Sequence, residues 1–598
     1  MLVVLAGALR SLCVAAGLLA FLALAGSALI PRRALGRSAL RLPCALSLGS
    51  LAVAWTLWVA GTLLGTASLP FVLLVWLAVG LRGARALARD AVRLLRRLTA
   101  LLRDQWPLAV PSVLLAVAAL PQLLLPLCDS DGTRYHVAYA KLFLLEGHVF
   151  RYPWDVTGSY PQAAEMLYLI AYRLGGLDAP KYVHAGFFAA SLAALVLLVH
   201  DRKKRRGAAL LAVFFLAASP VVLVPATAAF VDHVALFHFA AAALALRYRA
   251  PAWLVGAALG GALATKLPAA PGVLGLAAAA IVLPSRGRLR RAAQVLVPIA
   301  LAFLPFAVQN LLATGDPVFP VGHGLLRLPI PGVTTEALRY ASRLHGEIAG
   351  GIPWGARSGS GPDEVVGWHH LLGLLAIAVA IRHRELRPLA LPTVLYLVLG
   401  AAYGPPARYL VPAWFALSIF EAVAVADLLP VRLGVLGTVA ALPAALFTAR
   451  FTLTHFEPLP YLLGREDRTA FLSRVLPGHR AALLLNRLPP GGRVMALDYP
   501  SPVYFDRPWI GEGILTETPL RLWLRESPSA DALLARLRRH DVRYLVVTPG
   551  YGGGTPLSLL LVAERPEAAG PLLELRRRLR LAGRVDGVDI LAVPRSGE

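Results

Sequence analysis

Two segments, far apart in the sequence, carry carboxylates that could act in acid–base chemistry. CDSDGTRYHVAYAK holds Asp129 and Asp131 directly after an apolar run, and FVDHVALF holds Asp232 in a stretch that is otherwise apolar. A carboxylate can act as a general base towards an acceptor hydroxyl or amine. Placing an ionisable side chain in or beside a membrane span costs free energy unless that side chain has a partner. We therefore take each of these residues as a candidate functional residue.

Cationic side chains stand beside apolar runs in the same way. Arg134 follows Asp131 in the sequence, Lys266 lies in GALATKLPAA, and Arg408 lies in GPPARYLVPAW. Fixed cations can stabilise the charge that grows on a phosphate leaving group. Carboxylates and cations together are the equipment needed to transfer a group from a phosphate. Simpler interpretations are an Asp131–Arg134 salt bridge, helix packing through Asp232, and snorkelling of Lys266.

The segment between these motifs suits contact with lipid head groups. We expect a helix over 131–146, an aromatic loop GHVFRYPWDVTGSYPQ, and an amphipathic helix over 161–174. Two helices in the membrane plane, joined by such a loop, are typical of a protein that works at the interface. Its candidate substrate contacts are Tyr135, His136, Tyr160 and Glu165. Asp316 and His323 lie in another loop, TGDPVFPVGHG, whose Gly and Pro residues also fit a simple turn.

The composition predicts that these residues belong to a polytopic membrane protein. The chain has 598 residues, of which 57% are hydrophobic and 16% charged, and its mean hydropathy is +0.64. A soluble protein would carry about a quarter charged residues. Apolar runs recur up to residue 450, and a run of about 20 residues can span a bilayer. We therefore predict about 14 transmembrane helices.

The net charge of +25 does not indicate nucleic-acid binding, because the basic residues cluster in short loops between apolar runs. Six such loops fall on one side when the spans are counted, and the positive-inside rule makes that side the cytoplasm. All candidate site residues then lie on the other side. The basic segment 82–103 is expected to form an interfacial helix. Cys13, Cys44 and Cys128 form no redox or metal motif.

Three segments are predicted along the chain. Residues 1–106 hold extra transmembrane helices and the basic interfacial helix, with an apolar N-terminus that we interpret as a first span rather than a signal peptide. Residues 107–450 form a membrane domain with a first outer loop, 128–177. Residues 451–598 have the composition of a small α/β domain outside the cytoplasm, with helices at 465–488 and 531–540 and strands at 493–498, 542–548 and 587–593.

Residues 107 to about 427 resemble the GT-C superfamily of membrane glycosyltransferases. The resemblance is nearest to bacterial relatives of protein O-mannosyltransferases and of the lipid A aminoarabinose transferase, and is glycosyltransferase family 39-like. The motif DGTRYHVAYAKLFLLEGHVFRYPWDVTGSYPQAAEMLYLIAYRLGG resembles the first outer loop of the superfamily. FVDHVALF resembles its second acidic position, GALATKLPAA its "LTKG" stretch, and ARYLVPAW its "RYLLPALP" stretch. The chain departs from the pattern in its three extra N-terminal spans and in SYPQ, where the aminoarabinose transferase pattern has a lysine.

The resemblance implies an inverting glycosyltransferase. It implies Asp131 as catalytic base, although Asp129 competes for that role, and Asp232 as a residue that positions the acceptor. Lys266 and Arg408, with Arg134, would contact the donor phosphate. The partners would be a polyprenyl-phosphate-linked hexose or pentose and a lipid, glycan or protein acceptor. No cofactor is demanded, but some members use a divalent metal ion, so that question stays open. The expected location is the bacterial cytoplasmic (inner) membrane, with the active face and the C-terminal domain on the outer, periplasmic side.

Two alternatives come from other functional classes. A multi-pass transporter or flippase for a lipid-linked or small polar substrate would also contain charges in its membrane spans. Transporters often show internal repeats and charges at the midplane, whereas this chain shows no repeat and its charges are expected at one face. A non-catalytic scaffold would leave Asp131, Asp232 and Lys266 far apart in space.

Overall fold

The chain folds into two compact units, each built from stretches that are distant in sequence. Unit 1 comprises Met1–Leu127, Pro161–Phe306 and Leu344–Arg465, and unit 2 comprises Cys128–Tyr160, Ala307–Arg343 and Glu466–Glu598. The computed structural model describes residues 2–31, 35, 40–199, 206–282, 287–322, 366–367, 369–403, 407–428, 434–497, 499, 501–511, 519–520, 523, 529–548 and 566–595. The division into three domains, 1–106, 107–450 and 451–598, stays a prediction.

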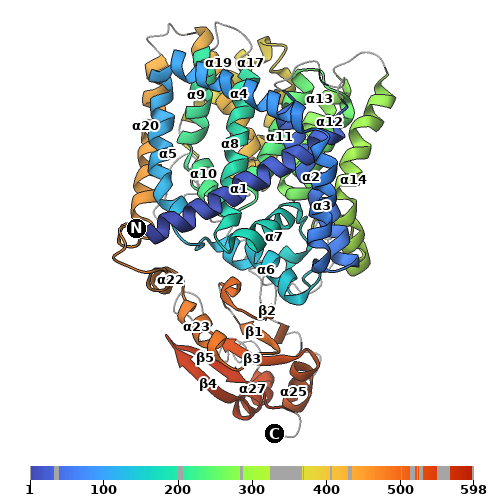
Figure 1. The fold of residues 1–598 in the computed structure, drawn as a ribbon, viewed down its shortest axis with the longest axis vertical. Coiled ribbons are helices and arrows are strands. Elements are labelled where there is room, and N and C mark those ends of the chain that lie inside the picture. Colours follow the sequence, from blue (N-terminus) through green and yellow to red (C-terminus); the bar gives the residue numbers. More distant parts are fainter. Residues whose placement is uncertain are drawn as a thin grey trace. The chain divides into compact units, whose positions relative to one another are not determined.

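Unit 1 is a bundle of helices (Figure 1). Its helices are α1 (Leu2–Leu29), α2 (Arg41–Leu63), α3 (Leu69–Leu81), α4 (Ala84–Asp104), α5 (Trp106–Leu124), α7 (Ala163–Gly175), α8 (Ala179–Val199), α9 (Arg206–Ala218), α10 (Pro220–Leu223), α11 (Asp232–Arg247), α12 (Ala252–Thr265), α13 (Ala270–Val282), α17 (His369–Arg382), α18 (Arg387–Tyr403), α19 (Val411–Leu428), α20 (Gly434–Thr454) and α21 (Leu459–Leu462). Helix α14 (Arg288–Thr314) begins in unit 1 and ends in unit 2.

Several of these helices are long and apolar enough to cross a membrane. Among the described residues six qualify by length and composition: Leu2–Leu29, Arg41–Leu63, Trp106–Leu124, Ala179–Val199, Arg288–Thr314 and Ala407–Asp427. The number rises to eight if two helix pairs, bent by 75° and 82°, each count as one span. The chain is thus an integral membrane protein. Helices also occupy the other apolar runs, but several have only 10–17 residues, so the expected count of about 14 spans stays a prediction.

Helices α1 and α2 cross at a pair of glycines. A Cβ atom added to Gly49 would lie 1.8 Å from the carbonyl oxygen of Leu22, and one added to Gly26 would lie 1.9 Å from that of Ala45. Small residues at such a crossing let the two backbones approach closely. In lipid the hydrophobic effect does not hold helices together, so the van der Waals contacts of this close approach stabilise the pair. This contact fixes the N-terminal helices against each other.

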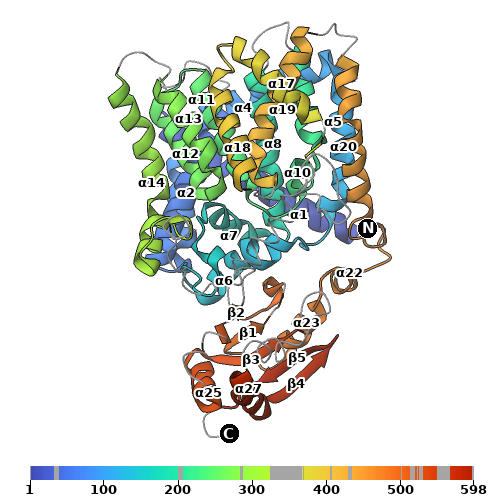
Figure 2. The ribbon, with the colours of Figure 1, turned by 180° about the vertical axis from the view of Figure 1, so that it is seen from behind.

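Helix α11 lies in the interior of unit 1 and packs against α8, α12 and α2. Figure 2 shows α12 and α13 beside it. Every residue from Asp232 to Leu246 is buried, as expected for a helix that is apolar on all faces. Helix α7 is also buried on all sides over Ala163–Ala171, against α1, α2 and α8. Neighbouring helices therefore cover α7 over this stretch, and its expected position in the membrane plane stays a prediction.

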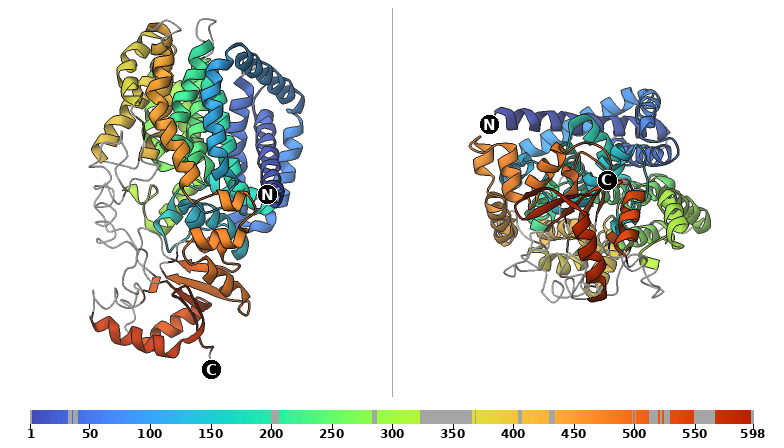
Figure 3. Two further views of the ribbon diagram at one scale, coloured as in Figure 1. Left: turned by 90° about the vertical axis from the view of Figure 1, so that its left-hand side faces the viewer. Right: turned by 90° about the horizontal axis from the view of Figure 1, so that it is seen from below.

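Unit 2 contains a mixed five-stranded sheet with the strand order β2-β1-β3-β5-β4. Figure 3 gives two further views of the chain, with this C-terminal part in orange to red. Strands β2, β1 and β3 are parallel, and β5 is antiparallel to both β3 and β4. Alternate residues of β1, Met495 and Leu497, pack in one apolar cluster with Leu533 and Leu537 of α25. The strands are β1 (Arg493–Leu497), β2 (Trp509–Gly511), β3 (Val542–Val547), β4 (Arg580–Val585) and β5 (Val588–Ala592), and the helices are α6 (Val137–Glu146), α22 (Arg468–Val475), α23 (His479–Arg487), α25 (Ala530–Arg539) and α27 (Pro566–Arg578).

The expected small α/β domain is present, with two differences. The helix expected over 465–488 is broken into α22 and α23 around Pro477, and Gly478 follows with a positive φ of 82°. Proline cannot supply a backbone donor inside a helix, so the break follows from its chemistry. Strands β2 and β4 were not expected. Strand β2 has only three residues, and β4 has weak apolar alternation.

The segment 128–160 packs within unit 2, against the C-terminal sheet and its connections. Lys141 Nζ donates to the carbonyl oxygen of Val503 at 3.0 Å and contacts Asp506 Oδ1 at 3.1 Å. Burial lowers the pKa of Lys141, and the Asp506 carboxylate opposes that shift. Arg493 of β1 makes a two-pronged contact with Glu146, at 2.9 and 2.8 Å. These charge-assisted contacts make the segment and the C-terminal domain one folding unit.

The glycine crossing of α1 and α2 gives a prediction for stability. We expect Gly49→Ala to lower the free energy of unfolding by about 1–3 kcal/mol, because the added methyl overlaps the α1 backbone. Gly17→Ala on α1 is the matched control, since nothing lies within 4 Å of its added Cβ. Thermal unfolding of the detergent-purified proteins measures the difference. Equal unfolding midpoints for the two variants would contradict the close crossing.

Candidate functional site

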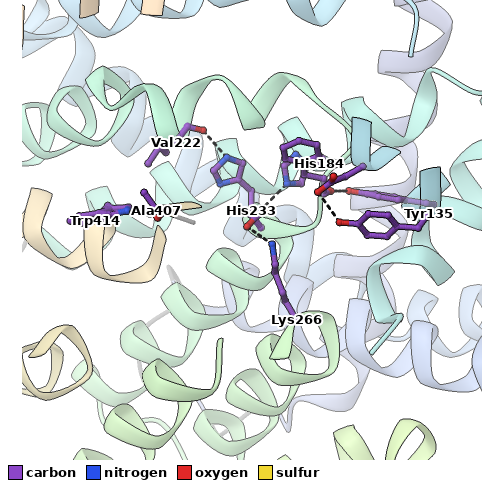
Figure 4. A network of polar contacts seen from close by, with 11 residues as sticks. Tyr135, His184, Val222, His233, Lys266, Ala407 and Trp414 are labelled. Carbon is purple, nitrogen blue, oxygen red and sulfur yellow. Dashed lines mark hydrogen bonds and ion pairs between the residues drawn. The ribbon is translucent and has the colours of Figure 1, made fainter. Parts of the chain in front are cut away.

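Two oppositely charged helix ends meet inside unit 1. Asp232 is the first residue of α11, and Lys266 directly follows the last residue of α12. A helix N-terminus favours an anion and a helix C-terminus favours a cation. The two side chains form an ion pair, with Lys266 Nζ 2.6 Å from Asp232 Oδ1 (Figure 4). The side chain of Lys266 is 16% exposed and that of Asp232 only 3%, so the pair lies largely away from water.

A second cation, Arg408, joins this pair from a 3-10 turn, Ala407–Leu410, that precedes α19. Its guanidinium lies 4.8 Å from the ring centre of Phe230, and Lys266 Nζ lies 4.4 Å from that of Tyr409. Arg408 also interacts electrostatically with the Asp232 carboxylate. Aromatic faces of this kind stabilise cations in apolar surroundings. We call Asp232, Lys266 and Arg408 the cationic cluster, because two positive charges face one negative charge.

The carboxylate of Asp232 is only half satisfied by this arrangement. Its Oδ1 contacts Lys266, whereas its buried Oδ2 has no hydrogen-bond partner among the described residues. Buried carboxylate oxygens normally accept hydrogen bonds. The second oxygen could therefore accept a hydrogen bond from a bound molecule, such as an acceptor hydroxyl, beside two cations of the kind that stabilise a phosphate.

Two histidines line the same region (Figure 4). The backbone N–H of His233 donates to His184 Nε2 at 3.0 Å, and the two rings lie 4.8 Å apart. His233 Nε2 lies 2.8 Å from the carbonyl oxygen of Val222 and donates to it, since a carbonyl only accepts. His184 was not among the residues predicted from the sequence. A single histidine in an apolar helix carries no spacing signal, so only the fold brings it to His233.

In unit 2 the two competing carboxylates have different environments. Asp129 Oδ1 accepts a hydrogen bond from the backbone N–H of Gly132 at 2.7 Å, as a helix-capping carboxylate does. Asp131 is buried, and its Oδ2 accepts from the Tyr135 hydroxyl at 2.7 Å. Ser130 Oγ lies 3.3 Å from the other oxygen of Asp131. Asp129 thus caps the start of the helical segment, whereas the Asp131 carboxylate is contacted by the hydroxyl groups of Tyr135 and Ser130.

The other predicted loop residues are spread over both units. His136 is buried, and its ring centre lies 4.1 Å from that of the half-buried Tyr135, with the two rings tilted by 52°. Both residues lie in a single π-helical turn, Gly132–His136, that also holds Arg134. Tyr160 follows a 3-10 turn in unit 2. Glu165 lies in the first turn of α7, buried in unit 1.

The loop at Asp316 fits its simpler interpretation. Asp316 Oδ1 accepts from the backbone N–H of Val318 at 2.9 Å, which is a local turn contact. His323, the other candidate in that loop, lies outside the described residues.

The cationic cluster does not have the ligands of a divalent metal site. Hard cations take several carboxylate, carbonyl or water oxygens, whereas this cluster offers one carboxylate that already contacts a lysine. Within the described residues, the side chains with metal-ligand spacing are His369, His370 and Glu421, which lie on α17 and α19. The roles of all predicted site residues stay predictions.

Comparison with known proteins identifies the fold. No protein-family model and no curated protein sequence matches the chain. The crystal structure of ArnT from Cupriavidus metallidurans in the apo state is similar, with a TM-score of 0.50, 16% identity, and coverage of 82% of this chain and 98% of that chain. The same protein bound to undecaprenyl phosphate gives a TM-score of 0.50 and 17% identity, over 81% of this chain and 98% of that chain. The archaeal oligosaccharyltransferase AglB from Archaeoglobus fulgidus, in complex with an inhibitory peptide and a dolichol-phosphate, has a TM-score of 0.44 and 13% identity, over 74% of this chain and 69% of that chain.

ArnT, a lipid A aminoarabinose transferase, belongs to the GT-C superfamily. The chain therefore shares the GT-C fold, as its motifs predicted.

The buried ion pair gives a stability prediction that does not depend on any activity. We expect Lys266→Met to lower the free energy of unfolding by about 3–5 kcal/mol, because it leaves the Asp232 charge buried without its partner. Adding Asp232→Asn should recover most of that loss. Lys266→Arg, which keeps the charge, is the control. Denaturation is measured for the detergent-purified wild type, Lys266→Met, Asp232→Asn, the double variant and Lys266→Arg. Additive losses in the double variant would contradict the pairing.

Proposed function

We propose that this chain is an inverting glycosyltransferase that moves a hexose or pentose from a polyprenyl-phosphate donor to an acceptor at the outer face of a bacterial inner membrane. The observation that carries the proposal is the buried cationic cluster in a GT-C fold. Two cations among apolar helices suit a ligand that is an anion at one end and a lipid chain at the other. A polyprenyl phosphate has that chemistry, and the structurally similar ArnT has been crystallised with undecaprenyl phosphate.

Lys266 and Arg408 would bind the donor phosphate in this mechanism. As the bond between the anomeric carbon and the phosphate oxygen breaks, the leaving phosphate gains negative charge. Cations that are already in place stabilise this charge without reorganisation. The guanidinium of Arg408 can donate two parallel hydrogen bonds to a phosphate, and Lys266 can add a point charge. Asp232 would keep both cations oriented and accept a hydrogen bond from the acceptor at its second oxygen.

Asp131 would act as the general base. It would take the proton from the acceptor hydroxyl or amine while that atom attacks the anomeric carbon from the side opposite the phosphate. One displacement of this kind inverts the configuration at that carbon. The hydrogen bond from Tyr135 orients the Asp131 carboxylate. Asp129 is the weaker candidate, because its carboxylate already caps the first turn of the helical segment.

The acceptor side of the reaction is proposed only by class. The acceptor would be a lipid, a glycan or a protein. Tyr135, His136, Tyr160 and Glu165 are the loop residues proposed to contact substrates, and Arg134 is a third proposed contact of the donor phosphate. The basic loops place the catalytic face outside the cytoplasm by the positive-inside rule. Mass spectrometry of surface glycans and lipid-linked sugars in a deletion strain would identify both the sugar and the acceptor.

The base assignment predicts different outcomes for two neighbouring carboxylates. We expect Asp131→Asn to reduce sugar transfer by about 10²–10⁴-fold, the usual contribution of a general base. Asp129→Asn should keep most of the activity, because an asparagine oxygen can still accept from Gly132 and cap the helix. Membranes supplied with a labelled polyprenyl-phosphate sugar measure the transfer.

Full transfer by the Asp131→Asn variant would remove Asp131 from the base role. If wild-type membranes moved the labelled donor across the bilayer without transferring its sugar, the transporter alternative would be favoured instead.

The phosphate assignment predicts an affinity change that can be measured without catalysis. We expect Arg408→Ala to weaken binding of undecaprenyl phosphate by about 10–100-fold, as for loss of charge-assisted hydrogen bonds. Undecaprenol, which lacks the phosphate, should bind wild type and variant alike. Arg173→Ala, on the exposed last turn of α7, is the control variant. Equal affinity of the Arg408→Ala and wild-type proteins for undecaprenyl phosphate would contradict the assignment.

A further inference from the structure

A second buried polar cluster lies in unit 1, where α17, α19 and the junction of α9 with α10 meet. His369 and His370 begin α17, Glu421 lies midway along α19, and Ser219 directly follows α9. Helix α19 packs against both α9 and α17. All four side chains are at most 3% exposed. Imidazoles and a carboxylate at this depth in an apolar bundle are unfavourable unless something compensates them.

Hydrogen bonds compensate part of this cluster. His370 Nδ1 lies 2.7 Å from Glu421 Oε1, and His370 Nε2 lies 2.7 Å from Ser219 Oγ. Trp414 stacks on the His370 ring with 5.5 Å between the ring centres. The position of His370 is therefore set from three sides.

Two polar atoms in the cluster remain without compensation. His369 Nδ1 and Glu421 Oε2 are buried, and neither has a hydrogen-bond partner among the described residues. His369 Nε2 lies 2.9 Å from the carbonyl oxygen of Phe215 and must donate to it. In the neutral ring, Nδ1 then carries the lone pair. A histidine that donates one N–H to a backbone carbonyl and presents its other nitrogen is in the form that binds metals.

The three side chains His369, His370 and Glu421 lie close enough together to bind one metal ion. One ligand atom from each of His369, His370 and Glu421 can be chosen so that all three lie within 4.8 Å of one another. Ligands of a tetrahedral zinc ion lie about 2.0–2.2 Å from the metal, and hence about 3.4 Å from each other. Small side-chain movements would close the remaining difference. Two imidazoles and one carboxylate are a ligand set of divalent transition metals.

We propose that His369, His370 and Glu421 bind a divalent transition-metal ion, with Zn²⁺ as the expected ion, and that Ser219 Oγ or a water completes its coordination. His370 would exchange one of its two present hydrogen bonds for the metal. Gly373 lies one turn after His369, and because it has no side chain the Glu421 carboxylate fits beside it. A Cβ atom there would lie 2.4 Å from Glu421 Oε1.

The position of the site indicates a structural role. Glu421 lies ten residues after Val411, the first residue of α19, which is about 15 Å along a helix. Arg408 of the cationic cluster precedes that first residue, so the ion would lie far from the proposed donor phosphate. It would instead link α17 to α19 beside the end of α9. This proposal is independent of the proposed function.

The test is the metal content of the full-length, tag-free protein. Protein purified in detergent is stripped with a chelator, equilibrated with micromolar Zn²⁺, freed of unbound ion and analysed for zinc. We expect about one Zn²⁺ per chain in the wild type and less than one tenth of that in Glu421→Gln. His238→Asn is the matched control, because His238 is a buried histidine on α11 that also contacts a serine, Ser47, at 2.8 Å. That variant should keep its zinc.

Two further measurements on the wild-type protein test the metal site even if a variant folds poorly. Zinc should raise the thermal unfolding midpoint of the stripped wild type, because an ion that binds only the folded state stabilises it. Cobalt in place of zinc should give the visible absorption of a tetrahedral Co²⁺ site. A wild-type protein that retains no zinc and shows no shift on zinc addition would overturn the site. Equal zinc loss in the His238→Asn and Glu421→Gln proteins would overturn it as well.

Discussion

A charge buried among apolar helices must find a partner, and this constraint organises the interior of unit 1. Asp232 and Lys266 satisfy it for each other across 2.6 Å. The pairing works because antiparallel neighbours α11 and α12 bring a helix N-terminus and a helix C-terminus to the same level, where the two backbone dipoles favour these charges. Moving either helix along its axis would separate the ions, so the pair also fixes the register of the two helices.

The same constraint explains why the cationic cluster is suited to a ligand. Lys266 pairs with Asp232, and Arg408 brings a second positive charge that contacts the aromatic rings of Phe230 and Tyr409. An anion that enters such a site replaces lost hydration with contacts that are already in place. The cluster of His369, His370 and Glu421 has the opposite character, since its uncompensated atoms are lone-pair donors. If both proposals hold, one bundle provides separate environments for an anionic lipid head group and for a metal ion.

In unit 2 the first loop depends on the C-terminal domain. The contacts of Lys141 with Val503 and of Glu146 with Arg493 join residues more than 340 positions apart. Asp131 is therefore carried by a segment whose fold needs the far end of the chain. Removing the C-terminal domain would leave Lys141 without the groups that compensate its burial.

The sequence by itself determined much of the local structure: the apolar runs became helices, the alternating runs near 493, 542 and 588 became strands, and the motifs indicated the GT-C fold. It also grouped Asp131 and Asp232 with Lys266, Arg408 and Arg134 on one face, and within unit 1 the structure brings Asp232, Lys266 and Arg408 together. Only the tertiary structure decided that α7 is buried, that Asp129 caps a helix while Asp131 contacts Tyr135, and that His369 and His370 meet Glu421. The physical reason is range. Periodicity and helix ends are set by neighbours within a few residues, whereas burial and ion pairing depend on which distant segments the packing brings together.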